Sequence, residues 1–287
     1  MGLIDLILNL GGLLLWLNWR SHRLDPLTRT APATLAGTLK RADVRRFGGW
    51  QIPAGLVLLL CLRVPLYGML GPPLHWTPKL NLGEIVPSFS IHVPGQILVF
   101  SVLSFLRVML IAYFWFFALV ALNRSVTESD PMLRILRMHL GRPGRWPWWL
   151  QLLLLPLGGA ALWAACHPLL AHLGVINPAL SPAHLAEQGL LIGFGLIFTL
   201  KLLLPVILLL HVVASYVYLG ANPFWEFIAV TSRNLLKPLQ PFPLRFAKVD
   251  FAPLAGVLLL SLLLNFPEIV KWAANALGHR SLTLWPL

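Results

Sequence analysis

Three basic side chains in this 287-residue sequence lie inside long apolar stretches, where charged residues are rare. They are Arg63, Arg107 and Lys201. If these stretches cross a membrane, each charge is energetically unfavourable there and is a candidate for function. No acidic residue lies well inside a stretch to pair with them. A functional interpretation of these charges is an ion or lipid-headgroup path between helices. The alternative is that the long side chains reach the membrane surface, which their aliphatic stems allow at modest depth.

Histidine is the second residue type that could do chemistry here. His167 and His211 lie in apolar stretches, and His211 is the candidate for a haem ligand. Haem held by two histidines needs them to face each other, whereas a lone histidine inside a membrane more often bonds a neighbouring hydroxyl or carbonyl group. The sequence has no His-x-x-x-His or Cys-x-x-Cys pair, and Cys61 and Cys166 are interpreted as small hydrophobes. We therefore expect no cofactor and no metal site.

The sequence offers no catalytic motif. It contains no Gly-x-x-x-x-Gly-Lys segment, no Gly-x-Ser-x-Gly segment and no paired carboxylates in a loop. Asp250 would need a partner to act in catalysis. As the first residue of a predicted helix, it is better suited to cap the free N–H groups there. We therefore expect that the protein is not an enzyme.

The composition is that of a protein whose solvent is largely lipid. The chain is 57% hydrophobic and 11% charged, with a mean hydropathy of +0.76, whereas about a quarter of a typical soluble domain is charged. The first apolar stretch has no basic leader and no small-residue cleavage site, so we expect a retained span. Six stretches approach the roughly 20 apolar residues that a membrane helix needs. They are Leu3–Leu17, Ile52–Leu70, Ile97–Leu122, Trp148–Leu170, Gly189–Tyr218 and Phe251–Trp272. The predicted fold is an all-α transmembrane bundle of about six spans.

The segments between these stretches alternate sharply in charge. Residues 18–50, 123–147 and 220–250 hold seven, five and four Lys/Arg residues, whereas the intervening and terminal segments hold three. Basic loops stay in the cytoplasm, so this asymmetry predicts cytoplasmic basic loops and both termini outside. The net charge of +12 is then a consequence of topology, and it favours anionic lipid headgroups over nucleic acid as the partner.

The chain repeats one plan three times: an apolar helix, a basic segment and a returning apolar helix. Asn18, Asn123 and Asn222 begin the three basic segments, and Pro53 and Pro253 end the first and third. We interpret this as three membrane hairpins, at residues 1–70, 97–170 and 189–272. The alternative is the ordinary alternation of any polytopic membrane protein.

The basic segments also carry apolar residues at helical spacing. Met132, Leu133 and Leu136 are interleaved with Arg134 and Arg137, and residues 224–237 follow the same pattern. Such a pattern is typical of a short helix that lies in the membrane interface, with its cationic side toward lipid phosphates. The alternative is a cytoplasmic helix that packs on its neighbours.

These motifs give the chain a resemblance to the YggT (YlmG) family of small integral membrane proteins. The unit of that family has an Asn-Pro, a Thr, a Leu-Leu-x-Pro-like basic segment and an Asp-x-x-Pro before the next helix. The third hairpin has this order, with Asn222, Pro223, Thr231, Leu235, Pro238, Asp250 and Pro253. The second hairpin has Asp130, Pro131, Arg134 and Arg137 in a similar core, followed by Trp146-Pro147 in place of the Asp-x-x-Pro.

The resemblance implies a non-enzymatic protein of the bacterial inner membrane. Members commonly carry one or two units, so a third hairpin is a departure from the family. The roles implied are those of a scaffold or assembly factor in division, envelope integrity or osmotic stress, with a protein partner. A small channel or transporter that uses Arg107 and Lys201 is the alternative, and a haem or cytochrome assembly component that uses His211 is a further one.

Overall fold

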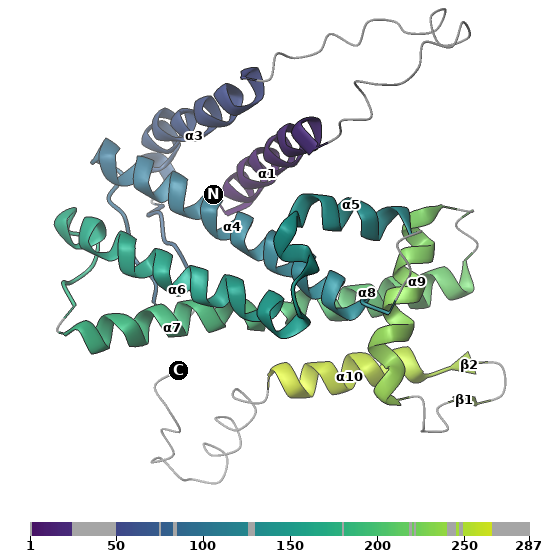
Figure 1. Cartoon of the computed structure of the whole chain (residues 1–287). Helices are drawn as coiled ribbons and strands as arrows, with labels where there is room; N and C mark the ends of the chain where they lie inside the picture. Colours follow the sequence, from purple (N-terminus) through teal and green to yellow (C-terminus); the bar gives the residue numbers. More distant parts are fainter. Residues whose placement is uncertain are drawn as a thin grey trace, which may run out of the picture. The chain divides into compact units, whose positions relative to one another are not determined.

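The computed structural model describes residues 2–24, 50–74, 76–82, 85–125, 130–179, 181–217, 220, 222–239, 245–246 and 249–265. Within these ranges the structure is almost entirely helical (Figure 1), which confirms the predicted all-α class. The longer helices are α1 (Gly2–Leu24), α3 (Gln51–Leu70), α4 (Pro94–Leu122), α5 (Pro131–Leu140), α6 (Trp148–His172), α7 (Pro182–Phe198), α8 (Leu200–Tyr216), α9 (Pro223–Leu236) and α10 (Ala252–Leu264). Short 3₁₀ helices are η2 (Pro72–Leu74), η3 (Arg142–Arg145) and η4 (Lys237–Leu239).

Five of the described helical segments are long and apolar enough to cross a membrane. They are Gly2–Ser21, Gln51–Leu70, Pro94–Leu122, Trp148–His172 and Pro182–Tyr216. Large apolar side chains also cover the outside of these segments, as an apolar solvent requires. On α1, for example, Leu3, Leu10 and Leu14 are all more than half exposed. The structure therefore supports a membrane protein. The predicted sixth span continues beyond the described residues, and α10 covers only its first part.

Prolines lie inside these helices without ending them. The helix α3 continues through Pro65, and α8 continues through Pro205. The fifth segment breaks at Thr199, between α7 and α8. The Thr199 hydroxyl bonds back to the Leu196 carbonyl and accepts a bond from the Trp115 indole at 3.0 Å, so side-chain bonds satisfy polar groups at the break.

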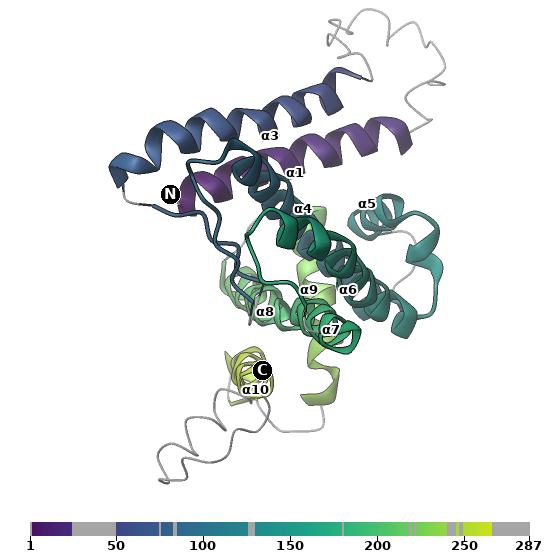
Figure 2. The same ribbon diagram turned by 90° about the vertical axis from the view of Figure 1, so that its left-hand side faces the viewer.

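The chain forms two compact units, each of which is described by itself. Unit 1 comprises Met1–Asn81, Ile85–Leu110 and Cys166–Pro178. In it α1 packs along α3 (Figure 2), and the first half of α4 contributes buried polar and aromatic side chains. Tyr67, Trp76, Phe89 and Phe100 form a cluster of aromatic rings in edge-on and tilted contacts, with centroids 5.0–6.2 Å apart.

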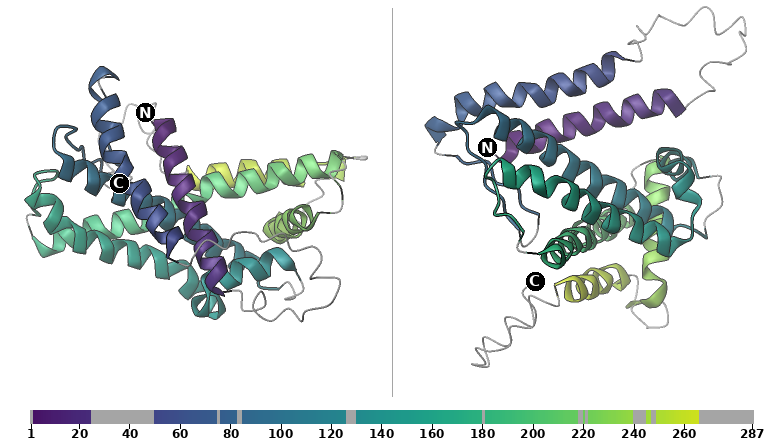
Figure 3. Two further views of the ribbon diagram at one scale, coloured as in Figure 1. Left: turned by 90° about the horizontal axis from the view of Figure 1, so that it is seen from above. Right: turned by 60° about the vertical axis from the view of Figure 1, so that its left-hand side comes forward.

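Unit 2 comprises Leu82–Glu84, Ile111–Ala165 and Ala179–Leu287. Its α8 packs against α10 and α9 (Figure 3). The helices α6 and α7 approach closely at their glycines, because a Cβ added at Gly193 would overlap the Pro156 carbonyl, and one at Gly189 would lie 3.0 Å from the Ala160 oxygen. Small residues permit such contacts between membrane helices, where lipid supplies no hydrophobic drive for packing.

Two short amphipathic helices, α5 and α9, replace simple loops in the second and third basic segments. In α9 the buried face includes Phe227, Ile228 and Thr231, and α9 packs on α5, α8 and α10. In α5, Leu133 and Leu140 are buried, while the apolar Ile135 and Met138 are 44% and 40% exposed beside basic residues. Packing on neighbours therefore accounts for the apolar face of α9, whereas α5 keeps the mixed apolar and basic surface that is typical of an interfacial helix.

The returning helix of the third hairpin begins later than predicted. Asp250 belongs to the short strand β2 (Val249–Asp250), which pairs antiparallel with β1 (Arg245–Phe246). The residue that precedes α10 is Phe251, which makes no side-chain capping bond. The prediction that Asp250 is the first residue of this helix is therefore wrong. Pro253 does lie in the first turn, where its missing N–H has no consequence.

Candidate functional site

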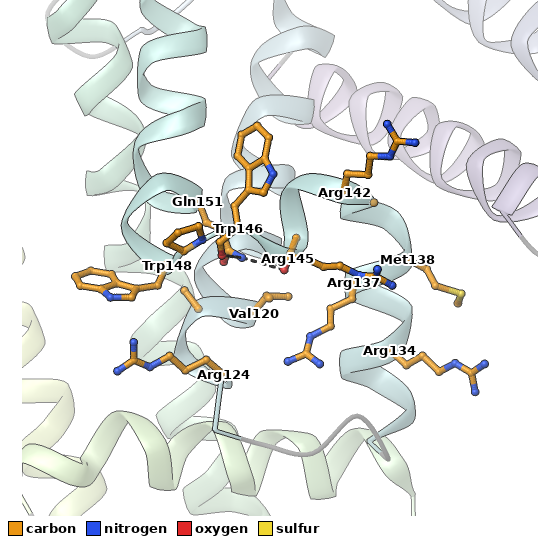
Figure 4. Close-up of a pocket in the computed structure, with 14 residues that line it drawn as sticks. Val120, Arg124, Arg134, Arg137, Met138, Arg142, Arg145, Trp146, Trp148 and Gln151 are labelled. Atoms are coloured by element: carbon orange, nitrogen blue, oxygen red, sulfur yellow. Dashed lines mark hydrogen bonds between the residues drawn. The ribbon is translucent and has the colours of Figure 1, made fainter.

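An arginine-lined groove in unit 2 is the strongest candidate for a binding site. The groove has a volume of about 1290 Å³ and is open on one side. Its basic lining residues come from the turn that follows α4, from α5 and from η3 (Figure 4), and they are Arg124, Arg134, Arg137, Arg142 and Arg145. The remaining lining includes Val120, Met138, Trp146, Trp148 and Gln151, and none of the lining residues that the structure describes is acidic. We call this feature the arginine groove.

Local sequence signals position the arginines. Asp130 caps α5, since its carboxylate accepts bonds from the N–H groups of Met132 and Leu133 at 2.9 and 3.3 Å. Pro131 follows as the first helical residue, where its missing N–H has no partner to lose. The sequence places both residues in a family-like motif. In the structure they begin the helix that carries Arg134 and Arg137.

A sharp turn brings the second pair of arginines back to the groove. Gly141 ends α5 with φ of +66°, a left-handed conformation that glycine adopts without steric penalty. The 3₁₀ helix η3 follows at once. The buried Gln151 of α6 then holds η3 in place, because its amide donates to the carbonyl oxygens of Gly144 and Trp146, both at 2.9 Å. The backbone that carries Arg142 and Arg145 is therefore fixed to the first turn of a membrane helix.

The groove concentrates positive charge. Figure 4 shows that Arg137 and Arg145 extend into the space between α5 and the start of α6, whereas Arg134 and Arg142 extend away from it. Guanidinium groups offer planar pairs of donors that match the oxygens of phosphate or carboxylate groups. A concave surface lined by charges of one sign also raises the local concentration of oppositely charged ligands. The groove is therefore built to attract an anion.

A second polar feature, in unit 1, changes the interpretation of Arg63. Its guanidinium is fully buried and pairs with the Asp5 carboxylate of α1, with 3.4 Å between nitrogen and oxygen. It also donates to the Asn9 side-chain oxygen at 2.9 Å and to the Ser101 carbonyl oxygen at 3.4 Å. The expectation that Arg63 has no acidic partner is therefore wrong, because α1 brings a carboxylate against α3.

The Asp5 carboxylate is in turn surrounded by donors. Besides Arg63, it accepts hydrogen bonds from the Tyr67 hydroxyl at 2.9 Å, the Ser104 hydroxyl at 2.9 Å and the Asn9 amide at 3.1 Å. The Asp5 side chain is 21% exposed, whereas Arg63 and Tyr67 are completely buried. We call this set the Asp5 cluster, and it joins α1, α3 and α4 through side chains inside the apolar segments.

The other two predicted intramembrane charges have different surroundings. Arg107 is half-buried in unit 1, one turn of α4 beyond Ser104 of the Asp5 cluster. Lys201 is exposed in unit 2, at the second residue of α8. The two residues therefore belong to different units. The exposure of Lys201 fits the interpretation in which its long side chain extends to a more polar region.

The family-like motif residues of the third hairpin meet the end of α4 in unit 2. The buried Asn123 donates to the Thr231 hydroxyl at 2.9 Å and accepts a bond from the Asn234 amide at 2.8 Å. Thr231 also bonds back to the Phe227 carbonyl within α9. Asn222 caps α9 through a bond to the Phe224 N–H at 3.0 Å, and Pro223 follows it. Thr231 and Asn222 thus position α9, while Leu235 lies at its end and Pro238 lies in η4.

The histidines do not gather into a ligand set in the described structure. His167 is buried in unit 1 and His211 lies in α8 of unit 2. Among the described residues, no three His, Cys, Asp or Glu side chains are placed to hold a metal ion.

The chain was compared with protein-family models, curated proteins and solved structures. No protein-family model matches the chain, and no curated protein or solved structure is significantly similar to it. The resemblance to YggT proteins accordingly stays a prediction, and the site must be interpreted from its own residues.

Sequence reasoning identified Arg134 and Arg137 but missed the groove that contains them. In the sequence, the other three groove arginines, Arg124, Arg142 and Arg145, contribute only to the charge of a basic segment. The sequence predicted neither the turn at Gly141 nor the hydrogen bonds by which Gln151 holds η3. Asp5 was missed because it stands near the end of its span. The signal that could have found it is an acidic residue and Asn9 one helical turn apart in an otherwise apolar helix.

Proposed function

We propose that the protein is a non-enzymatic membrane scaffold or assembly factor of the YggT type, which gathers an anionic component at the arginine groove. The observation that carries this proposal is a concave site lined by five arginines, with no acidic residue among its described lining. Its backbone is fixed by the capping of α5 and the bonds of Gln151. A pre-formed cationic groove supports binding rather than chemistry, because none of the lining residues in the described part of the chain is a nucleophile or a general base at ordinary pH.

The location that we propose is the bacterial inner membrane, with the arginine groove on the cytoplasmic side. The charge asymmetry of the sequence supports this orientation, since all five arginines of the groove belong to one basic segment. On that side they face anionic lipids and the negatively charged proteins of the cytoplasm. A scaffold with this orientation would hold its partner against the membrane surface.

Affinity capture from native membranes tests the scaffold. The tagged protein, the double variant Arg137→Gln/Arg145→Gln and the control Arg233→Gln are each solubilised in mild detergent and captured. Arg233 is an exposed arginine of α9 outside the groove. We expect one stoichiometric partner with the wild type and the control, and its loss with the double variant. A protein that is captured alone, or a partner that the double variant retains fully, would refute the proposal.

The alternative function is a small channel or transporter. The observation that favours it is the Asp5 cluster, which places a carboxylate, a guanidinium and a phenol inside the apolar part of unit 1, with Arg107 one turn away. Flux measured in liposomes separates the two functions. A conduit loses its flux in Arg107→Ala or Lys201→Ala, whereas a scaffold shows no specific flux and keeps its partner in both variants.

An absorption spectrum of the captured protein tests whether it binds haem. A haem protein would show a Soret band, and His211→Ala would remove that band.

A further inference from the structure

We propose that the ligand of the arginine groove is the phosphate-bearing headgroup of an anionic membrane phospholipid. This inference deepens the proposed function and rests on it, since it names the component that the groove gathers. Three observations carry it: the position of the groove on the membrane helices, the kinds of side chain that line it, and its size.

The groove lies where two membrane helices end. Val120 and Ala121 belong to the last turn of α4, and Trp148 and Gln151 belong to the first turn of α6. Both helices are long and apolar enough to cross a membrane. The ends of such helices lie at the depth of the lipid headgroups. A ligand in the groove therefore occupies the same layer as phospholipid phosphates, whereas a soluble anion would have to enter that layer from water.

The non-basic lining residues fit a lipid. Trp146 and Trp148 are 44% and 51% exposed, and half-exposed tryptophans are characteristic of the membrane interface, where an apolar ring and a polar N–H are both accommodated. Met138 adds an exposed apolar side chain from α5. The groove thus offers guanidinium groups to a phosphate and apolar surface to the first carbons of the acyl chains. A purely electrostatic site for a soluble anion does not need this second kind of surface.

The size of the groove also suits a lipid. Pockets for drug-sized ligands measure about 300–1,000 Å³. The arginine groove measures about 1290 Å³ and is open, which leaves room for a headgroup with its glycerol while the chains remain in the bilayer. A single inorganic phosphate would touch only a small part of this lining.

The test measures lipid on the purified full-length protein. The protein in a mild non-ionic detergent is titrated with phosphatidylglycerol, and bound lipid is counted by native mass spectrometry. Phosphatidylcholine, inorganic phosphate and a polyglutamate peptide are titrated in parallel. The variants are Arg137→Gln, Arg145→Gln, their combination and Arg145→Lys, with Arg233→Gln as the matched control. Circular dichroism before and after heating shows which variants are folded.

We expect saturable binding of phosphatidylglycerol that phosphatidylcholine does not match. Each basic residue near a membrane surface contributes about 1 kcal/mol to the attraction, which corresponds to roughly a fivefold loss of affinity for each groove arginine that is removed. Arg145→Lys keeps the charge but not the paired donors, so a loss with this variant as well would show that geometry contributes. Affinity should also fall as salt is raised, although less than for a fully exposed charge.

Several results would overturn the inference. Equal binding of both lipids, or an equal loss in Arg233→Gln, would show that no specific headgroup site is present. Tighter binding of inorganic phosphate or of the polyglutamate peptide than of phosphatidylglycerol would assign the groove to a soluble anion or to an acidic protein. The proposed function fails separately: if the lipid binds as expected but capture yields no partner, the lipid site stands without a scaffold. If a partner depends on the groove but no lipid binds, the scaffold stands and the lipid inference fails.

Discussion

Removing the carboxylate of Asp5 should destabilise the protein far more than removing the arginine with which it pairs. In Asp5→Leu the buried guanidinium of Arg63 loses its counter-charge, and breaking a buried pair in this way costs about 3–5 kcal/mol. Three uncharged donors also lose their acceptor, each worth about 0.6 kcal/mol inside a membrane. Arg63→Met should cost less, about 1–2 kcal/mol, because the partly exposed carboxylate keeps those three donors.

The stability of the double variant decides whether the two residues interact. Replacing both members of a buried ion pair by apolar residues is often close to neutral. The free energy of unfolding of Asp5→Leu/Arg63→Met should therefore fall by only about 2 kcal/mol, because three hydrogen-bond donors lose their acceptor. The singles sum to about 6–9 kcal/mol, so the two sites should couple by about 4–7 kcal/mol, above the roughly 0.5–3 kcal/mol that is usual for residues in contact. Leu6→Ala, on the exposed face of the same helix, is the control and should change stability by less than about 0.5 kcal/mol.

The assay is reversible unfolding of the purified protein in mixed micelles with increasing dodecyl sulfate, followed by circular dichroism. The reasoning would be refuted if the loss in the double variant equalled the sum of the two single losses within about 0.5 kcal/mol. It would also be refuted if Asp5→Leu were as stable as the Leu6→Ala control. Either result would mean that α1 is not held to α3 by this pair.

Three further predictions concern unit 2. Gly193→Leu should destabilise the protein by about 1–3 kcal/mol or more in the same unfolding assay, because the new side chain would overlap the Pro156 carbonyl. Gly158→Leu is the control and should be nearly neutral, because a Cβ added at Gly158 meets nothing within 4 Å. Thr231→Val should cost about 1 kcal/mol and speed proteolysis near α9, because a buried asparagine loses its hydroxyl partner; unchanged stability and cleavage would contradict this. In a cysteine-free background, Arg134→Cys should react with a membrane-impermeant maleimide only after the cells are opened, and labelling of intact cells would reverse the proposed orientation.

The sequence predicted the features that depend on one helix alone. Hydropathy located the long helices, because the length and apolarity of a span are local properties. Asp130 and Pro131 indicated the start of α5, because capping requires only residues adjacent in the chain. The glycines of α6 and α7 fit the close contact that the structure shows, because small residues let helix backbones approach each other.

The features that depend on which helix faces which were not predictable. Arg63 and Asp5 are 58 residues apart, and their pairing follows from the packing of α1 on α3, which no periodicity encodes. The break at Thr199 was missed because proline is the stronger signal, yet the protein keeps α8 helical at Pro205 and interrupts the chain where hydroxyl and indole bonds are available. The arginine groove was missed because a left-handed Gly141 turns the chain back on itself.

Arg63 in the Asp5 cluster and the arginines of the groove lie in different surroundings, and these surroundings indicate different roles. Arg63 is buried and bonded to Asp5, Asn9 and the Ser101 carbonyl, so its charge is balanced within unit 1 and its first consequence is the stability of the helix packing. The arginine groove instead gathers five arginines on one concave surface at the ends of α4 and α6, and such a surface raises the local concentration of anionic ligands. The cationic groove, rather than the buried pair, is therefore where we propose that the protein meets its partner.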